Sequence, residues 1–378
     1  MRPDRTTVVE GRLAARAAVA ADQLRARSLP WWSRRIDVRH GGYLLSESEK
    51  QLATQSRMVW TFAHSHRKRF GDYLPAAEQG LAFLLKRFRD PRHGGFYWKT
   101  DLAGRVLDDR KILYGHLFVV YALVEYARAS GNRDALVEAL SLLDLLGRRA
   151  HDDRHGGWLE HFRRSWRPIR WRRRGAEVEV PGRKSANTHL HAVEALAELC
   201  TDARDLESEA LLRETVEVCT SYFYPEDPRA ASRRRSRDWS SPDRPEPSVG
   251  HNVEFARLLL RADDVLRREP RWSRFDAYLS HALTAPRPER VWWVEAELLA
   301  ALTVGAARDN RYAAPLEDLL AFLLAHQIDP VDGVWLDTVA DDGRPLKPIK
   351  VGTWKDAYHD VRAGVLLAEA FGGRQGAV

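Results

Sequence analysis

A Gly-Gly turn with nearly the same neighbours recurs along this chain of 378 residues. RHGG is followed each time by an aromatic residue, as RHGGY at 39–43, RHGGF at 92–96 and RHGGW at 154–158, and VDGVW at 331–335 is a weaker echo. The first two intervals are 53 and 62 residues, and the third spans about three more units of that size. A period of this length indicates a repeated supersecondary unit, and the chain has room for six.

The segments between the turns carry apolar residues at helical spacing, for example at 48–70 and 111–130. Strand-like alternation is confined to short pieces beside the glycines. An open solenoid would end in polar capping repeats, whereas the first and last helical stretches here are strongly apolar. The sequence therefore predicts one all-α domain over 1–378. It would be an (α/α)6 barrel of six helical hairpins, with short β-hairpins at one mouth and the aromatic residues of the turns lying over that mouth.

Composition narrows the class of protein. No stretch approaches the roughly 18 apolar residues that a membrane helix needs, and the N-terminal stretch lacks the pattern of a signal peptide. Cys200 and Cys219 are the only cysteines, which excludes a disulfide framework and a cysteine metal cluster. We expect a cytoplasmic enzyme, monomeric or homodimeric, that has no membrane partner.

The net charge of +7 comes mostly from two Arg-rich segments, 163–175 and 229–241. The favoured interpretation is that both are solvated loops, so that nucleic acid is not a partner. The alternative is a non-catalytic helical scaffold that binds RNA or another anionic partner. In that case Trp166, Trp171 and Trp239 would serve as base-stacking platforms.

Polar side chains gather at the starts of four otherwise apolar helical stretches. The clusters are Asn187, His191 and Glu194; His251 and Glu254; His359; and Arg57 with Trp60. The inner helices of a barrel would aim all four clusters at one axial cavity. Taken singly, each histidine could instead be structural. No complete metal-ligand or dinucleotide motif accompanies the clusters, so we expect neither a metal nor a cofactor.

These residue types suit one kind of reaction. Aromatic rings stack on the apolar faces of sugars while polar groups bind the hydroxyls. Two imidazoles can move protons in both directions near neutrality, and an arginine can stabilise the negative charge of an enediolate. The combination predicts proton abstraction next to the carbonyl of a sugar.

In its order and spacing of motifs, the chain resembles the N-acylglucosamine 2-epimerase family over about residues 35–371. That family includes cellobiose 2-epimerases, mannose 2-epimerases and aldose–ketose isomerases, and its fold is an (α/α)6 barrel. The segments that carry the resemblance are SRMVWTFA around Arg57, KILY at 111–114, KSANTHLHAVEA, SVGHNVEFARLLL, RVWWVEAE and KVGTWKDAYHDVRA.

The resemblance implies a role for each candidate residue. His251 and His359 correspond to two general acid/base groups on opposite sides of the substrate carbon, and Arg57 to the group that steadies the enediolate oxygens. His191 and Glu254 correspond to groups for ring opening and hydrogen bonding. Contacts with the sugar are implied at Asn187, Tyr114 and Trp354, and Trp60 and Trp293 are further candidates for substrate binding.

The implied activity is cofactor-independent 2-epimerisation of an aldose, either the reducing-end glucose of cellobiose-type disaccharides or free mannose or glucose. Aldose–ketose isomerisation of mannose or glucose to fructose would use the same residues and is the alternative. A more distant alternative is an (α/α)6 glycoside hydrolase that uses Glu194 and Glu254. Two departures from cellobiose epimerases bear on the substrate: Ala357 replaces the usual proline of W-K-x-P-Y-H, and Glu295 replaces the usual glutamine after W-W-V.

Overall fold

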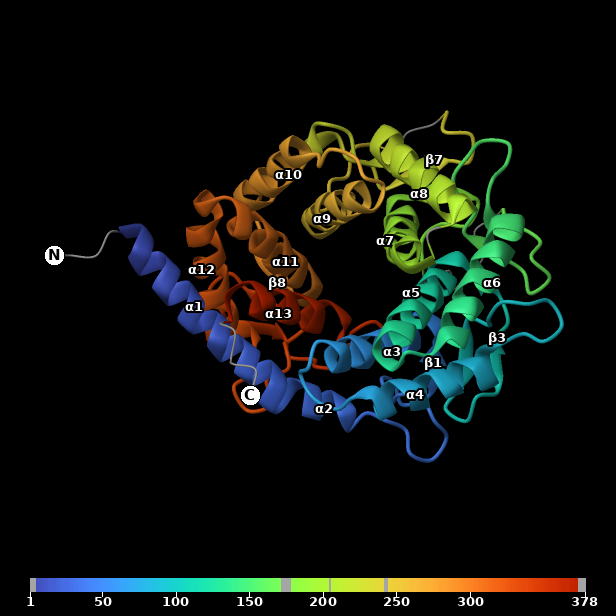
Figure 1. The fold of residues 1–378 in the computed structure, drawn as a ribbon, viewed down its shortest axis with the longest axis horizontal. Coiled ribbons are helices and arrows are strands. Elements are labelled where there is room, and N and C mark those ends of the chain that lie inside the picture. The colour runs from blue at the N-terminus through green and yellow to red at the C-terminus, as the bar shows by residue number, and fades with distance from the viewer. Residues whose placement is uncertain (1–4, 171–177, 204, 241–243, 373–378) are drawn as a thin grey trace.

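The computed structural model describes residues 5–170, 178–203, 205–240 and 244–372. Within them, six helices form an inner ring and six others surround it (Figure 1). The inner helices are α3 (Leu52–Arg67), α5 (Leu113–Ser130), α7 (Ala186–Ala203), α9 (Val249–Val265), α11 (Trp292–Arg308) and α13 (Tyr358–Phe371). The outer helices are α1 (Arg5–Gln23), α4 (Leu74–Phe83), α6 (Arg133–Ala150), α8 (Leu206–Val218), α10 (Trp272–Thr284) and α12 (Ala313–Phe322), and the short α2 (Leu29–Ser33) follows α1. Because α13 packs beside α3, the inner ring is closed, and the predicted (α/α)6 barrel is confirmed.

Inner and outer helices differ in how much of their surface is buried. In α5 every residue from Leu113 to Tyr126 is buried, whereas α6 buries a single stripe that includes Ala139, Leu142 and Leu146. An all-round apolar helix belongs inside a protein and a one-sided helix at its surface, so the sequence pattern itself sorts the helices into two rings. None of the described helices combines the length and apolar character of a membrane span.

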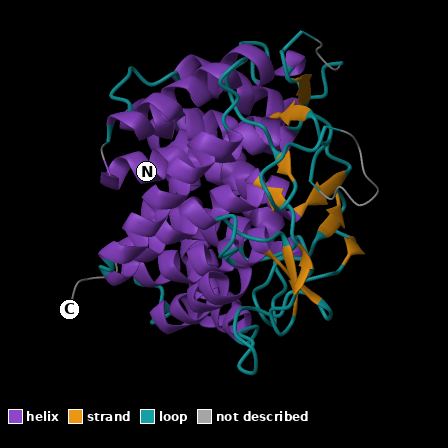
Figure 2. Cartoon of the chain, turned by 90° about the vertical axis from the view of Figure 1, so that its right-hand side faces the viewer, coloured by secondary structure: helices purple, strands orange, loops and turns teal. Residues whose placement is uncertain are grey.

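The short strands lie together at one end of the ring, as predicted (Figure 2). A strand just before an inner helix pairs with one from a later connection: β1 with β2, β4 with β5, β6 with β7, and β8 with β9, all antiparallel. Hydrogen bonds therefore join neighbouring units at this end. The strands are β1 (Glu49–Gln51), β2 (Lys99–Asp101), β3 (Val106–Asp108), β4 (Lys111–Ile112), β5 (His161–Phe162), β6 (Arg183–Ser185), β7 (Arg234–Ser236), β8 (Glu289–Val291), β9 (Thr338–Ala340) and β10 (Pro345–Lys347).

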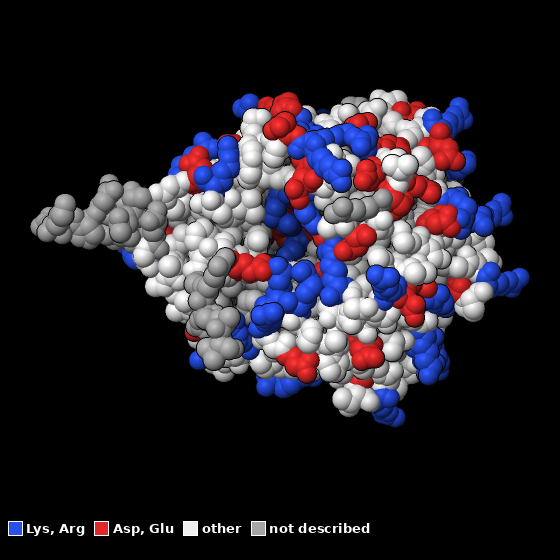
Figure 3. All heavy atoms as spheres, in the orientation of Figure 1, with Lys and Arg blue, Asp and Glu red and all other residues white. Residues whose placement is uncertain are grey.

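The opposite end of the ring, which faces the viewer in Figure 3, is hollowed at its centre, and side chains of both charges gather around the hollow. Ion pairs link the C-terminal parts of the inner helices there. Arg67 contacts Glu125 at 2.7 Å, and Arg261 contacts Glu198 at 2.8 Å. The candidate catalytic residues lie toward the other end, where the inner helices begin.

A buried Asp–Lys pair holds each RHGG turn. An aspartate precedes the turn, and a lysine from the strand that leads into the next inner helix donates to it. All three lysines are at most 1% exposed. The pairs are Lys50–Asp37 at 2.7 Å, Lys111–Asp90 at 3.0 Å and Lys184–Asp152 at 3.0 Å. An ion pair at each repeated turn therefore connects one unit to the next.

The glycines make room for this connection. Gly94 and Gly95 have φ values of 72° and 66°, a region that side chains with a Cβ rarely occupy, and a Cβ on Gly95 would lie 2.7 Å from Trp166. The next residue, Phe96, donates its backbone N–H to Nε2 of His116 at 2.9 Å and is 1% exposed. Tyr43 and Trp158 are likewise at most 1% exposed and donate to Ala76 of α4 and Thr215 of α8. The aromatic residues of the turns are therefore packed in the core, and the expectation that they lie over the mouth is wrong.

The described residues of the two Arg-rich segments, 163–170 and 229–240, contact two of the turns. Arg237 donates two hydrogen bonds to Asp152, at 2.8 and 2.7 Å, and the indole of Trp239 donates to the carbonyl of His155 at 2.6 Å. Trp171 lies outside the described residues. The first segment repeats the pattern, with Arg164 on Asp90 and Trp166 on His93. Arg164 and Arg237 thus anchor the segments, whereas Arg163, Arg167, Arg170 and Arg229 are exposed, as expected of solvated loops. Both described tryptophans are engaged in the fold.

We expect Asp152→Asn to lower the free energy of unfolding by about 1.5–3 kcal/mol, because it weakens charge-assisted hydrogen bonds to Lys184 and Arg237. Denaturant unfolding would measure the change. The matched control is Asp153→Asn, one residue away, where the carboxylate is 94% exposed. Equal unfolding midpoints for the two variants would contradict a stabilising role for the Asp–Lys pair.

Candidate active site

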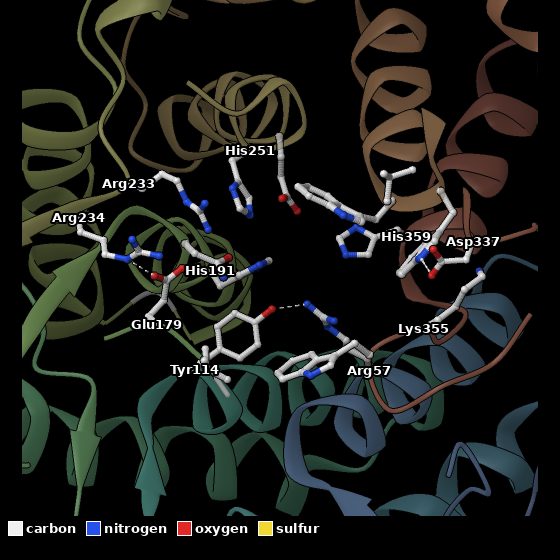
Figure 4. Close-up of a pocket in the computed structure, with 17 residues that line it drawn as sticks. Arg57, Tyr114, Glu179, His191, Arg233, Arg234, His251, Asp337, Lys355 and His359 are labelled. Atoms are coloured by element: carbon white, nitrogen blue, oxygen red, sulfur yellow. Dashed lines mark hydrogen bonds and ion pairs between the residues drawn. The ribbon is translucent and has the colours of Figure 1, made fainter. Parts of the chain in front are cut away.

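A cavity of about 540 Å³ lies between the N-terminal ends of the inner helices and the adjacent loops and strands (Figure 4). Its volume falls within the usual range for small-molecule sites. Nine of the ten candidate residues line it: Arg57, Tyr114, Asn187, His191, His251, Glu254, Trp293, Trp354 and His359. Segments far apart in the chain therefore meet at one place.

Trp60 is the exception. It does not line the cavity and is 3% exposed. Its ring stacks on His64, at a centroid distance of 4.4 Å, and on Tyr121 at 5.1 Å. One helical turn separates Trp60 from Arg57, but that turn directs its ring into the core. We therefore assign Trp60 to packing and not to contact with the sugar.

His359 is the second residue of α13 and is paired with a buried carboxylate. Its Nδ1 lies 2.6 Å from Oε1 of Glu297 on α11, and its ring meets Trp292 edge-on. Burial lowers the pKa of His359 to about 3, while the hydrogen bond to Glu297 acts in the opposite direction. This pairing leaves Nε2 as the nitrogen able to serve a ligand in the cavity.

His251 lies in the first turn of α9, where its backbone N–H bonds the capping hydroxyl of Ser248. Its ring is tilted against Trp293 at a centroid distance of 4.8 Å. Burial lowers the pKa of His251 to about 3, with further lowering from the charges of His191 and Arg233. The ring is therefore neutral at pH 7 and has a free lone pair for accepting a proton.

Arg57 reaches the cavity from α3. Its Nη2 donates to the hydroxyl of Tyr114 at 2.6 Å, its Nη1 lies 3.7 Å from Asp356, and its guanidinium sits over the ring of Phe118. Burial raises the pKa of Tyr114 to about 12, partly offset by Arg57, so the phenol stays protonated. Arg57 therefore brings a fixed positive charge to the cavity.

Arg362 forms a charged network directly behind the cavity. Its guanidinium contacts Glu194, Glu297 and the hydroxyl of Tyr358, and lies 2.9 Å from Glu254. The network reaches the cavity histidines through their carboxylate partners, since Nδ1 of His191 lies 2.9 Å from Glu194 and Nδ1 of His359 pairs with Glu297. One guanidinium thus contacts the carboxylates that orient two of the rings.

The same carboxylates raise the question of a metal ion. His191 with Glu194 and Glu254, and His359 with Glu254 and Glu297, are spaced closely enough to ligate one. The guanidinium of Arg362 already contacts all three carboxylates. A cation bound there would meet that positive charge, so the donor set fits an internal ion-pair network better than a metal site.

Glu254 differs from its neighbours in this network. Burial and the charge of Glu297 together raise the pKa of Glu254 to about 8, against the opposing effect of Arg362. Burial would also raise the pKa of Glu194, but Arg362 and His191 outweigh burial, and that pKa falls to about 2. Glu254 is therefore the carboxyl that can carry a proton near neutral pH.

Sequence reasoning assigned no role to several residues at this site. Glu297 and Arg362 support it from behind, and the further lining residues are Val178, Glu179, Arg233, Arg234, Val291, Trp292, Asp337 and Lys355. A signal was present: Glu297 follows Trp293 by one helical turn, and Arg362 follows His359 by three residues, so each shares a face with a candidate residue.

The two departures noted in the sequence do not reach the cavity. Glu295 is completely buried and pairs with Arg287 and Arg290, at 3.1 and 3.3 Å. Ala357 is also completely buried and precedes the first residue of α13. Neither residue lines the cavity.

Comparison with known proteins places these features among sugar-converting enzymes. The family model for N-acylglucosamine 2-epimerase (GlcNAc 2-epimerase) matches residues 36–363. The cellobiose 2-epimerase of Bacteroides fragilis is 28% identical over 385 residues, which cover 91% of this chain and 96% of that protein. The D-mannose isomerase of Thermobifida fusca is 27% identical over 328 residues, 76% of each chain. The structure of cellobiose 2-epimerase from Spirochaeta thermophila superposes with a TM-score of 0.86 at 29% identity, covering 95% of this chain and 97% of that one.

Proposed function

The chain belongs to the N-acylglucosamine 2-epimerase family, and from that premise we propose that it is an isomerase that interconverts the C2 epimers of an aldose. The observation that carries the proposal is the arrangement of His251, His359 and Arg57. They come from three different inner helices and face one cavity (Figure 4).

In the proposed reaction one histidine removes the proton from C2 of the open-chain sugar, and the other delivers a proton to the opposite face. Arg57 stabilises the negative charge that develops on the enediolate oxygens between these steps. His251 is suited to act as the base because it has a neutral ring. His359 has an equally low pKa of about 3 and is likewise neutral before the reaction, but its contact with Glu297 stabilises the charged form that it takes when it holds a proton. The roles exchange when the reaction runs in reverse.

Ring opening is proposed for His191 and Glu254. His191 is held by Glu194, and Glu254 can be protonated near neutral pH, so the two supply a base and an acid at the same cavity. Asn187, Tyr114, Trp293 and Trp354 would bind the sugar. Trp354 is 36% exposed, which leaves its ring accessible for stacking.

The alternatives make different use of the same cavity. Ketose formation needs the enediolate to be reprotonated at C1, which one histidine could accomplish, whereas inversion at C2 needs groups on both faces. Two histidines meet the requirement of inversion, but ketose formation would use the same residues, so the products of the reaction separate the two activities. A hydrolase would need two carboxyls flanking the bond, but Glu194 and Glu254 both contact Arg362.

We expect product analysis to show C2 epimers when the protein is incubated separately with cellobiose, mannose and glucose, without added metal or nucleotide. In D₂O, the product should carry deuterium at C2. Fructose formed from mannose or glucose would identify an aldose–ketose isomerase instead. Recovery of all three sugars unchanged and without deuterium would refute the proposed activity on this substrate class.

A further inference from the structure

Lys355 is a buried lysine of unusual surroundings. It lines the cavity and is 3% exposed. Among the described residues, its Nζ has no hydrogen-bond partner. Its Nζ lies over the ring of Trp292, at 4.2 Å from the ring centroid.

The other buried lysines among the described residues provide the comparison, and one of them, Lys99, is 8% exposed and pairs with Glu49 at 2.7 Å. Lys50, Lys111 and Lys184 are as buried as Lys355, and each donates to the aspartate of a Gly-Gly turn at 2.7–3.0 Å. Burying an ammonium group without a hydrogen-bonded partner destabilises a protein. Lys355 is thus the buried lysine that departs from the pattern, and it does so inside the cavity.

Acidic groups surround Lys355 without satisfying it. Asp337, Asp356 and Asp360 attract its charge, and burial nevertheless lowers the pKa of Lys355. Asp337 already accepts hydrogen bonds from Trp292 and Thr338. Asp356 and Asp360 have buried carboxylate oxygens without a hydrogen-bond partner, yet neither accepts from Nζ. Among the described residues, the donors of Nζ are therefore free for another oxygen.

The position of Lys355 indicates which oxygen that is. Lys355 lies beside Asp337, on the side of the cavity that holds His359 (Figure 4). The residue that follows it, Asp356, lies 3.7 Å from Arg57. Lys355 and Arg57 are therefore tied to the same short loop before α13, and both bring positive charge to the region where C1 and C2 would react.

We propose that Lys355 is a substrate-binding residue whose Nζ donates to a sugar oxygen at C1 or C2 and strengthens that bond as the oxygen gains enediolate charge. The inference rests on the proposed function. Lys355 would act on the sugar beside Arg57 as a second cation. Binding of the sugar would explain why the protein keeps a buried ammonium group that has no hydrogen-bond partner among the described residues.

Lys355→Met tests this with two measurements on the full chain. The free energy of unfolding should stay equal or rise, because an unpaired buried charge is removed while the length of the side chain is kept. The value of kcat/KM should fall by about 10–100-fold, the range expected for losing a charge-assisted hydrogen bond to the substrate. Lys355→Gln should behave in the same way.

The matched control is Lys184→Met, which makes the same change at an equally buried lysine that is paired with Asp152. It should lower stability, because Asp152 loses one of its cationic partners. The inference requires both Lys355 results together, and any other combination overturns it. A loss of stability with lost activity would show that Lys355 supports the fold, and an unchanged kcat/KM would show that it does not bind substrate.

Failure of the inference about Lys355 can be distinguished from failure of the proposed function. If the wild-type protein converts none of the three aldoses, the proposed function fails first. Calorimetric binding of the unreactive sugar alcohol sorbitol, in wild-type and Lys355→Met proteins, then tests Lys355 separately. Equal affinity for sorbitol in that case would overturn the inference, and weaker binding by the variant would support it.

Discussion

Replacing either His251 or His359 by asparagine is expected to reduce epimerisation by about 10²–10⁴-fold, the usual contribution of a general acid or base. Inversion at C2 needs groups on both faces of that carbon, which one ring cannot easily reach. The two rings come from α9 and α13 and face one cavity. Loss of either should therefore block inversion. Initial rates of epimer formation, measured by product analysis, would give the size of each effect.

Deuterium exchange separates the roles of the two histidines. A variant that keeps the base for one epimer should still exchange the C2 proton of that epimer with D₂O, although it forms no product. The complementary variant should exchange the other epimer. His66→Asn is the control, because His66 is a partly exposed residue of α3 that pairs with Asp72. A folded His251 or His359 variant that epimerises at nearly the wild-type rate would refute the two-histidine assignment.

The barrel could be predicted because its evidence is local and repeated. The Gly-Gly turns give the period, and the contrast between all-round apolar and one-sided helices separates the two rings. The partners of the turns could not be assigned from sequence, since Asp152 meets Lys184 and Arg237 from positions 32 and 85 residues away. For the same reason the hydrogen bonds of Arg164 and Arg237 to Asp90 and Asp152 could not be predicted, because no nearby residue in the sequence indicates a buried carboxylate.

At the candidate site, too, some residues could be predicted from the sequence and others could not. Residues at helix starts, such as His191, His251 and His359, could be brought to one cavity once a ring was inferred. The carboxylates that hold two of them differ in origin, because Glu194 is three residues from His191, whereas Glu297 reaches His359 from another helix. Trp60 shows the limit of helical spacing, which places a residue near a face but does not fix where a large ring points.

Arg362 should have the largest effect on stability of the residues at the site. Arg362→Met is expected to lower the free energy of unfolding by about 3–5 kcal/mol at pH 7, since removing one partner of a buried ion pair leaves an uncompensated charge. Here the charges lie on Glu194 and Glu297, which contact the guanidinium, as Glu254 also does, and are at most 3% exposed. Urea unfolding of wild type and variant would measure the difference.

The effect of Arg362→Met on the free energy of unfolding should depend on pH. In the wild type, the pKa of Glu194 is held near 2, so its contribution to stability is present above the pKa of an unfolded glutamate and is lost as the pH falls below it. Without Arg362, burial should raise the pKa values of Glu194 and Glu297 above their unfolded values. Protonation would then relieve the repulsion as the pH falls.

The deficit of Arg362→Met relative to wild type should therefore shrink between pH 7 and pH 5. Arg148→Met, which removes an arginine that is 61% exposed on α6, should cost little at either pH. A deficit that stays constant with pH would mean that Arg362 acts through packing alone. In that case the charge of Arg362 would not affect Glu194 and Glu297, the carboxylates that pair with His191 and His359. The inferred electrostatic link between the two histidines would then be refuted.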